Sequence, residues 1–293
     1  MKMVCLNVHF LMAVMFTVIL ATLNNMVLGE NISIDPNDIH GGVTMGVSNA
    51  VCDNGKANIQ IDWDPNSSDE YTCYEGSSEN YKVRLHSSHC DKTAQQPLHI
   101  CYPRAINYTE DLPTSGSHRP LWPKYGEYLY LPPQRWIHSL EHGAVVFLYH
   151  PCAEPSEIEK FKAVARDCLH RYILSPYKKL PPDMNFALLV WQCRLVMSNV
   201  DLPLMVNFIK TRALNGPERV SRDGQYDVGL LRHAGIVSDV EDSELCPRMR
   251  IMAATAEVFK NRSAARRSKY QQSDQMWQRY RQQYRQQMPD VEI

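Results

Sequence analysis

Two continuous apolar runs dominate the hydrophobic pattern of the chain. The first, Ala144 to Tyr149, has the length of a strand and is rich in valine and aromatic residues, and the second runs from Phe186 to Met197. Strands that are buried on both faces of a sheet are apolar without alternation. The pattern therefore predicts two central strands, which we expect to be neighbours in one sheet.

Two further segments have apolar residues at helical spacing. A Ser156-x-x-Glu159 capping box opens the first. Its apolar positions are Ile158, Phe161, Ala165, Cys168 and Tyr172. The second begins near Asp201 and stops at Asn215-Gly216-Pro217, because glycine and proline are typical just beyond a helix end. These patterns predict helices over residues 157–172 and 202–214.

The order strand, helix, strand, helix predicts an α+β fold, with a small mixed sheet covered by helices. We place this core domain at residues 101–246. Residues 30–100 are expected to form a cysteine-containing, β-rich region, because residues 57–61 and 81–85 alternate between apolar and polar side chains. This region is either a separate disulfide-stapled module or an extension of the core.

The C-terminal tail, residues 247–293, differs in kind from the core. It is basic and rich in glutamine, and it is predicted to be helical. Its aromatic residues Tyr270, Trp277, Tyr280 and Tyr284 fall near one helical stripe. That stripe is expected to be a packed face of a largely solvated tail, with docking on a partner or at a membrane interface as the alternative.

The N-terminus predicts export. Lys2 precedes an apolar run from Phe10 to Leu23, and Val27-Leu28-Gly29 offers a small-residue cleavage site. The run is shorter than the ~20 apolar residues of a membrane-spanning helix, so we interpret residues 1–29 as a signal peptide. No later stretch is apolar enough to span. The mature protein is therefore expected to be secreted or held in the lumen of the secretory pathway.

Cysteine usage fits an oxidising compartment. Of nine cysteines, Cys5 would leave with the signal peptide, and the remaining even set predicts four disulfides of open connectivity. No C-x-x-C spacing occurs, which disfavours a zinc ribbon or a redox pair. Four N-x-[ST] sequons, at Asn31, Asn66, Asn107 and Asn261, predict a glycoprotein.

The charge pattern bears on partners. The formal net charge is −1 and both signs are interspersed, which gives no reason to expect nucleic acid or an anionic membrane as a partner. We expect the partner to be an extracellular or lumenal protein.

Candidate chemistry is concentrated between Pro113 and Cys152. His138 and His142 are four residues apart, so they would share one helical face, and Glu141 lies between them in sequence. Gly143 is the residue expected just after the helix that carries them. His118 lies in the preceding proline- and glycine-containing loop, which cannot be a regular helix.

Three histidines here could supply nitrogen ligands to zinc or another divalent metal. His138 and His142, joined by His118 or by His150 at the strand end, would leave one tetrahedral position for water. Glu141 would then be the candidate catalytic base. If Glu141 were itself a ligand, two histidines and a carboxylate would resemble an open iron triad.

A purely structural role is the alternative. A histidine at a helix C-terminus is stabilised by the helix dipole by ~0.3–1 kcal/mol, and Glu141 paired to His118 or His142 would join loop to core. A protease is disfavoured because Gly143 ends the helix at once. His86, His89 and His99 stand in a polar region and are interpreted as solvated.

The same stretch carries a family resemblance. PTSGSHRPLWPKYGEY and RWIHSLEHGAVVFLYHPC resemble a domain of unknown function whose hallmarks are a TSG-x-H-x-P loop and an H-x-LEHG element. The similarity covers roughly Cys101 to Gly216. Among animal members it is similar to a tumour-suppressor-inducible membrane protein associated with growth restraint, although this chain lacks a second apolar span.

The predicted function is that of an exported, disulfide-bonded glycoprotein acting as a binding or signalling module, and the resemblance implies growth restraint. The alternative is a metal-dependent hydrolase or oxidoreductase that uses His118, His138, His142 and Glu141.

Overall fold

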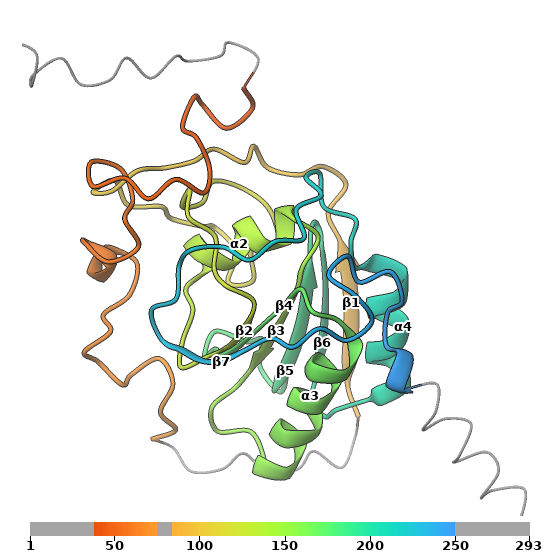
Figure 1. The fold of residues 1–293 in the computed structure, drawn as a ribbon. Coiled ribbons are helices and arrows are strands. Elements are labelled where there is room, and N and C mark those ends of the chain that lie inside the picture. The colour runs from red at the N-terminus through yellow and green to blue at the C-terminus, as the bar shows by residue number, and fades with distance from the viewer. Residues whose placement is uncertain (1–37, 75–83, 250–293) are drawn as a thin grey trace, which may run out of the picture.

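A computed structural model describes residues 38–74 and 84–249 (Figure 1). The expected signal peptide and most of the basic tail, with its aromatic stripe, lie outside the described residues. Two of the four sequons, Asn66 and Asn107, are described, and both side chains are exposed. Within the described residues no helix combines the length and apolar character needed to cross a membrane.

The core is one seven-stranded mixed sheet in the order β1-β6-β5-β3-β4-β2-β7. Its strands are β1 His86–Cys90, β2 Gly126–Tyr128, β3 Val145–Tyr149, β4 Tyr172–Pro176, β5 Phe186–Val190, β6 Cys193–Met197 and β7 Leu230–His233. Strand β4 pairs in parallel with both β3 and β2, and the other pairs are antiparallel. The predicted α+β class is confirmed.

Helices cover this sheet. They are the α-helices α2 Pro133–Glu141, α3 Pro155–Cys168 and α4 Leu202–Arg212; a short 3-10 helix, η1 Ile59–Ile61, precedes the sheet in sequence. Figure 1 shows α3 and α4 together on one side of the sheet and α2 apart from them. Right-handed crossovers explain this arrangement, since β2-α2-β3 and β3-α3-β4 run in opposite directions along the sheet.

The two apolar runs are neighbours, as predicted, but the second is not a single strand. Residues 186–197 form the hairpin β5–β6, which turns at Gln192 in a left-handed backbone conformation (φ 62°). Every residue of β5 is buried. Continuous hydrophobicity concealed this turn, because both strands of the hairpin belong to the interior of the sheet.

The helix predicted over 157–172 is shorter and begins earlier. Glu154, not Ser156, is its N-cap, and its side chain accepts the backbone N–H of Glu157. The helix ends at Cys168, and Tyr172 opens strand β4. The Asp242 carboxylate accepts the backbone N–H groups of residues 170 and 171, which holds this segment outside the helix.

All four predicted disulfides are present in the described part of the chain. The pairs are Cys52–Cys101, Cys73–Cys152, Cys90–Cys193 and Cys168–Cys246. Three of them join the region before residue 101 to the core. Within that region residues 59–61, expected in a strand, form η1 instead. Four disulfides indicate an oxidising environment.

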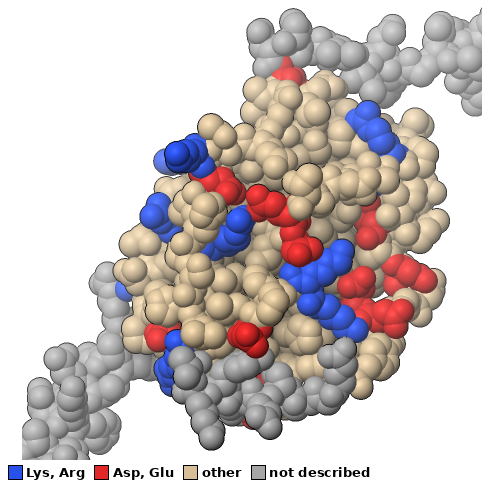
Figure 2. All heavy atoms as spheres, turned by 180° about the vertical axis from the view of Figure 1, so that it is seen from behind, with Lys and Arg blue, Asp and Glu red and all other residues tan. Residues whose placement is uncertain are grey.

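The surface shows mixed charge. Figure 2 shows acidic and basic side chains next to one another on the face that it presents. This distribution agrees with the formal net charge of −1.

Candidate metal centre

Helix α2 carries the first two residues of the site. Eight of its nine residues, Gln134 to Glu141, are buried, so its polar side chains point into protein rather than into water. His138 and Glu141 are three residues apart and therefore lie on neighbouring positions of one face. Gly143 has φ 84°, and a Cβ there would lie 2.9 Å from Leu214 Cα, so glycine is needed where the chain turns into β3.

The loop before α2 returns His118 to this helix, as expected. His118 donates its backbone N–H to Leu98 O and pairs with His99 in an isolated parallel bridge, which brings a further imidazole into contact. His118 Nε2 lies 3.1 Å from Glu141 Oε2. One ligand atom from each of His99, His118, His138 and Glu141 lies within 4.8 Å of the others. We refer to these four residues as the inner cluster.

The three imidazoles of the inner cluster are held in the same way. Their Nδ1 atoms contact backbone carbonyl oxygens, at 2.6 Å (His99 to Val43), 2.9 Å (His118 to Gly116) and 2.7 Å (His138 to Arg119). A carbonyl only accepts, so each Nδ1 is the donor. In a neutral imidazole the proton on Nδ1 leaves a lone pair on Nε2. All three rings therefore present Nε2 as an acceptor or a ligand.

These Nε2 atoms have no hydrogen-bond partner. The Nε2 atoms of the three rings and Glu141 Oε2 are buried and unpaired. His118 Nε2 and Glu141 Oε2 are close, but their contact lacks hydrogen-bond geometry. Unpaired buried polar atoms are rare and costly. Four such atoms facing one another form a group that could hold a metal ion.

Burial keeps His99 and His138 neutral. It lowers the pKa of His99 to about 4, and it lowers the pKa of His138 to well below the ordinary value, with the neighbouring imidazoles acting in the same direction. Neutral imidazole is the metal-binding form of histidine. His99 and His138 are thus in the form of histidine that can bind a metal ion.

Glu141 lacks the usual partner of a buried carboxylate. Its side chain is fully buried, and among the described residues only the imidazoles of His40 and His118 lie at ion-pair distance. The nearby guanidinium groups form salt bridges with other carboxylates: Arg119 pairs with Asp62, and Arg135 pairs with Asp53.

The other two predicted ligands lie outside the inner cluster. His142 follows α2 as its C-cap, and its Nε2 lies 3.1 Å from Glu218 Oε2, although its ring is only 4.7 Å from that of His138. Burial lowers the pKa of His142, and the hydrogen bond from His142 lowers that of Glu218. His150 follows β3, and its Nδ1 accepts the backbone N–H of Cys152.

The model of a domain family of unknown function, DUF3105, matches residues 99–224. No curated protein and no solved structure matches the chain. The domain includes the whole inner cluster and Glu218, whereas His40 and Val43 precede it. The expected resemblance is therefore supported at the level of a family of unknown function, and the likeness to a growth-restraint protein stays a prediction.

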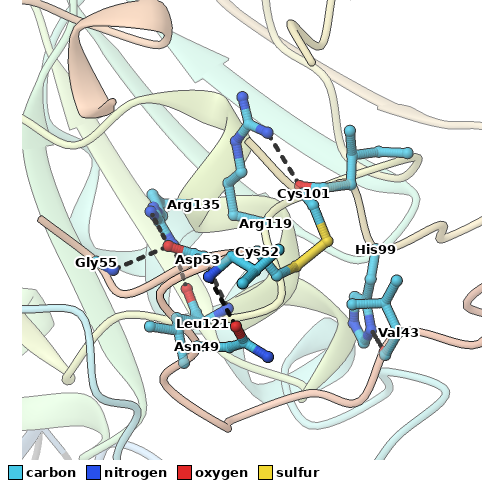
Figure 3. The surroundings of a disulfide bond; sticks show 12 residues. Val43, Asn49, Cys52, Asp53, Gly55, His99, Cys101, Arg119, Leu121 and Arg135 are labelled. Atoms are coloured by element: carbon cyan, nitrogen blue, oxygen red, sulfur yellow. Dashed lines mark hydrogen bonds and ion pairs between the residues drawn. A yellow bond between two sulfur atoms is a disulfide. The ribbon is translucent and has the colours of Figure 1, made fainter. Parts of the chain in front are cut away.

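Residues before the segment that matches the family model help to build the site. In Figure 3 the Cys52–Cys101 disulfide joins these residues to the matched segment two residues after His99, and His99 points toward Val43. The interpretation of His99 as solvated is wrong, because its exposed fraction is only 3%. The sequence patterns also do not identify His40 and Glu218 as residues of the site. No local motif marks either residue; a weak signal for Glu218 is the Gly216-Pro217 pair that precedes it.

Proposed function

We propose that this protein is an exported, disulfide-bonded domain that binds a divalent transition metal, such as zinc, through the inner cluster. The observation that carries the proposal is the shared orientation of three buried imidazoles. Each gives Nδ1 to a backbone carbonyl and turns an unpaired Nε2 toward the same carboxylate. This is the arrangement in which proteins hold metal-ligating histidines, because the Nδ1 hydrogen bond fixes the tautomer and the ring.

The distances support coordination. Ligand atoms about 2.0–2.1 Å from a tetrahedral zinc ion are roughly 3.3 Å from one another. The 3.1 Å between His118 Nε2 and Glu141 Oε2 agrees with such an edge. Three nitrogens and one oxygen favour zinc, iron or copper over calcium and magnesium, which prefer oxygen ligands.

Enclosure favours a structural or binding role for this ion. His118, His138 and Glu141 have no exposed surface, and four protein ligands leave no open position in a tetrahedral site. In this proposal Glu141 is a ligand rather than a catalytic base. Hydrolysis or redox chemistry would need a substrate position at the ion, so we favour a binding or signalling module whose core is held by metal. Its partner would be an extracellular or lumenal protein.

Metal analysis tests the proposal. The mature chain should be secreted without a histidine tag, stripped with a chelator, reloaded with zinc and measured by elemental mass spectrometry. We expect wild type to retain zinc, and His118→Ala and His138→Ala to lose the inner ion. The matched controls His86→Ala and His89→Ala, on the exposed strand β1, should retain it. Folded wild type that takes up no zinc, cobalt, iron or copper would refute the proposal.

A further inference from the structure

A second set of ligand atoms lies against the inner cluster and shares Glu141 with it. His40 Nε2 lies 3.2 Å from Glu141 Oε1 and 3.4 Å from Glu218 Oε1. One ligand atom each from His40, Glu141 and Glu218 falls within 4.8 Å of the others. His142 Nε2 contacts the second oxygen of Glu218 at 3.1 Å. We refer to His40, Glu141, Glu218 and His142 as the outer group.

Glu141 is oriented as a bridge between the two sets. Its Oε2 faces the inner imidazoles and its Oε1 faces His40. The ring of His40 stacks on that of His99, with centroids 4.4 Å apart, so the two sets are in direct contact. A carboxylate whose two oxygens face separate groups of ligands is the usual link in sites that hold two metal ions about 3.5–4 Å apart.

His40 has the environment of a ligand. Its Nδ1 lies 3.1 Å from Asp38 Oδ1, so a carboxylate orients the ring while Nε2 faces Glu141 and Glu218. All three neighbours are acceptors when ionised, and a neutral imidazole can donate to only one side. Either a second proton or a metal ion must therefore lie on the Nε2 side. Nearby, His142 Nδ1 is buried and has no hydrogen-bond partner.

The backbone places Glu218 at this position. Its N–H donates to Glu141 O at 3.1 Å, which docks the segment after α4 on the end of α2. A Cβ on Gly216 would lie 2.1 Å from Glu141 O, so this docking requires glycine. The sequence after α4 thus brings the Glu218 carboxylate to His40 and His142, beside the inner cluster.

We propose that the outer group binds a second divalent cation, bridged to the first by Glu141. This inference rests on the proposed function, because the bridge assumes an ion at the inner cluster. The outer position differs from the inner one in access. The Glu218 side chain is 24% exposed and that of His40 is 11% exposed, whereas Glu141 and His118 are fully buried. The second ion is therefore the exchangeable one, with coordination positions open to water.

Zinc stoichiometry tests this proposal. Chelator-stripped wild type is dialysed against increasing zinc, and bound zinc is counted per chain. We expect two equivalents, the second weaker and removed first by chelator. His40→Ala and Glu218→Ala should keep the first equivalent and weaken the second at least tenfold. Glu159→Gln, an exposed carboxylate on α3, and His89→Ala should bind two. Thermal unfolding and absence of free thiols confirm that each variant is folded.

Other outcomes separate the two proposals. One zinc in wild type, unchanged in His40→Ala and Glu218→Ala, would overturn the second site and leave the inner one; His40 would then be an orienting hydrogen-bond partner of Glu141. Two equivalents that survive both substitutions would place the second ion elsewhere and overturn the assignment. Loss of both ions from folded His40→Ala would assign His40 to the inner ion and would also overturn the proposed second site. No zinc in wild type would overturn both proposals.

Discussion

Two buried polar clusters adjoin helix α2, and they differ in how many of their polar atoms have a hydrogen-bond partner. The paired-charge cluster consists of Asp53 with Arg135 and Asp62 with Arg119. Arg135 reaches both oxygens of Asp53, and Arg119 reaches both oxygens of Asp62. The spare donors bond to carbonyl oxygens of residues 100 and 121. Figure 3 shows Asp53 and Arg135 in this arrangement.

In the inner cluster only some of the polar atoms have a hydrogen-bond partner. Its Nδ1 atoms are all bonded, yet its three Nε2 atoms and one carboxylate oxygen are not. The two clusters share Arg119. Its side chain pairs with Asp62 in the paired-charge cluster, and its backbone carbonyl accepts the Nδ1 hydrogen of His138 in the inner cluster. Poor packing does not explain the unpaired atoms, because the charged groups of the neighbouring cluster are all paired. A metal ion bound as proposed would give these atoms a partner.

The largest effect should come from breaking the complete cluster. Asp53→Ala would leave the Arg135 guanidinium buried without a counterion, and we expect a loss of about 3–5 kcal/mol in unfolding free energy, with or without metal. Denaturant unfolding measures this. The double variant Asp53→Ala/Arg135→Met should lose less than the single one, because no charge is stranded. Equal losses would show that packing, not charge pairing, holds this cluster.

The metal-free inner cluster should be sensitive to acid. The pKa of His99 is lowered to about 4 from an ordinary 6.5, so the unfolded chain takes up this proton first as pH falls. Stability is therefore full above pH 6.5 and is lost as pH falls toward 4, by about 3 kcal/mol for a shift of this size. Denaturant unfolding of chelator-treated protein across this range checks it. A flat profile would contradict the burial of a neutral His99.

Metal should stabilise wild type and leave an inner-cluster variant unaffected. At free zinc of about 100 times Kd, binding to the folded state adds about 2.7 kcal/mol to the unfolding free energy. Thermal unfolding with and without zinc should show this shift in wild type. In His138→Ala the shift from the inner ion should disappear. A shift of the same size in both proteins would place the stabilising ion elsewhere.

The smallest effects are expected on β1, where His86 and His89 are exposed. His86→Ala and His89→Ala should change the unfolding free energy by no more than about 0.5 kcal/mol. Their zinc binding should equal that of wild type. A larger change would mean that these histidines are not the solvated side chains that both sequence and structure indicate.

Local sequence predicts the parts of the fold that local forces decide. Val145–Tyr149 and Phe186–Val190 are neighbouring strands because unbroken apolar runs of this length must be buried on both faces. The end of α3 was missed because Asp242, far along the chain, accepts the N–H groups that would otherwise continue the helix pattern to Tyr172. Helical spacing alone does not reveal such a distant carboxylate.

The site residues also divide into those that local sequence predicts and those that only long-range contacts bring together. His138 and Glu141 could be predicted together because one helical turn joins them, and His118 because the loop before α2 had to return. His99 could not, since its burial depends on a bridge to His118 and on a carbonyl from Val43. His40 and Glu218 enter through long-range docking of chain segments, which leaves no periodic signal in the sequence.

X-ray absorption at the zinc edge tests the central claim most directly, in wild type loaded with a single equivalent. The account predicts three imidazole nitrogens and one carboxylate oxygen at about 2.0–2.1 Å. In His138→Ala loaded identically, that three-imidazole signature should be absent. A first shell of water oxygens, or of one or two imidazoles, around zinc in the folded wild-type protein would contradict the claim that His99, His118 and His138 together bind the ion.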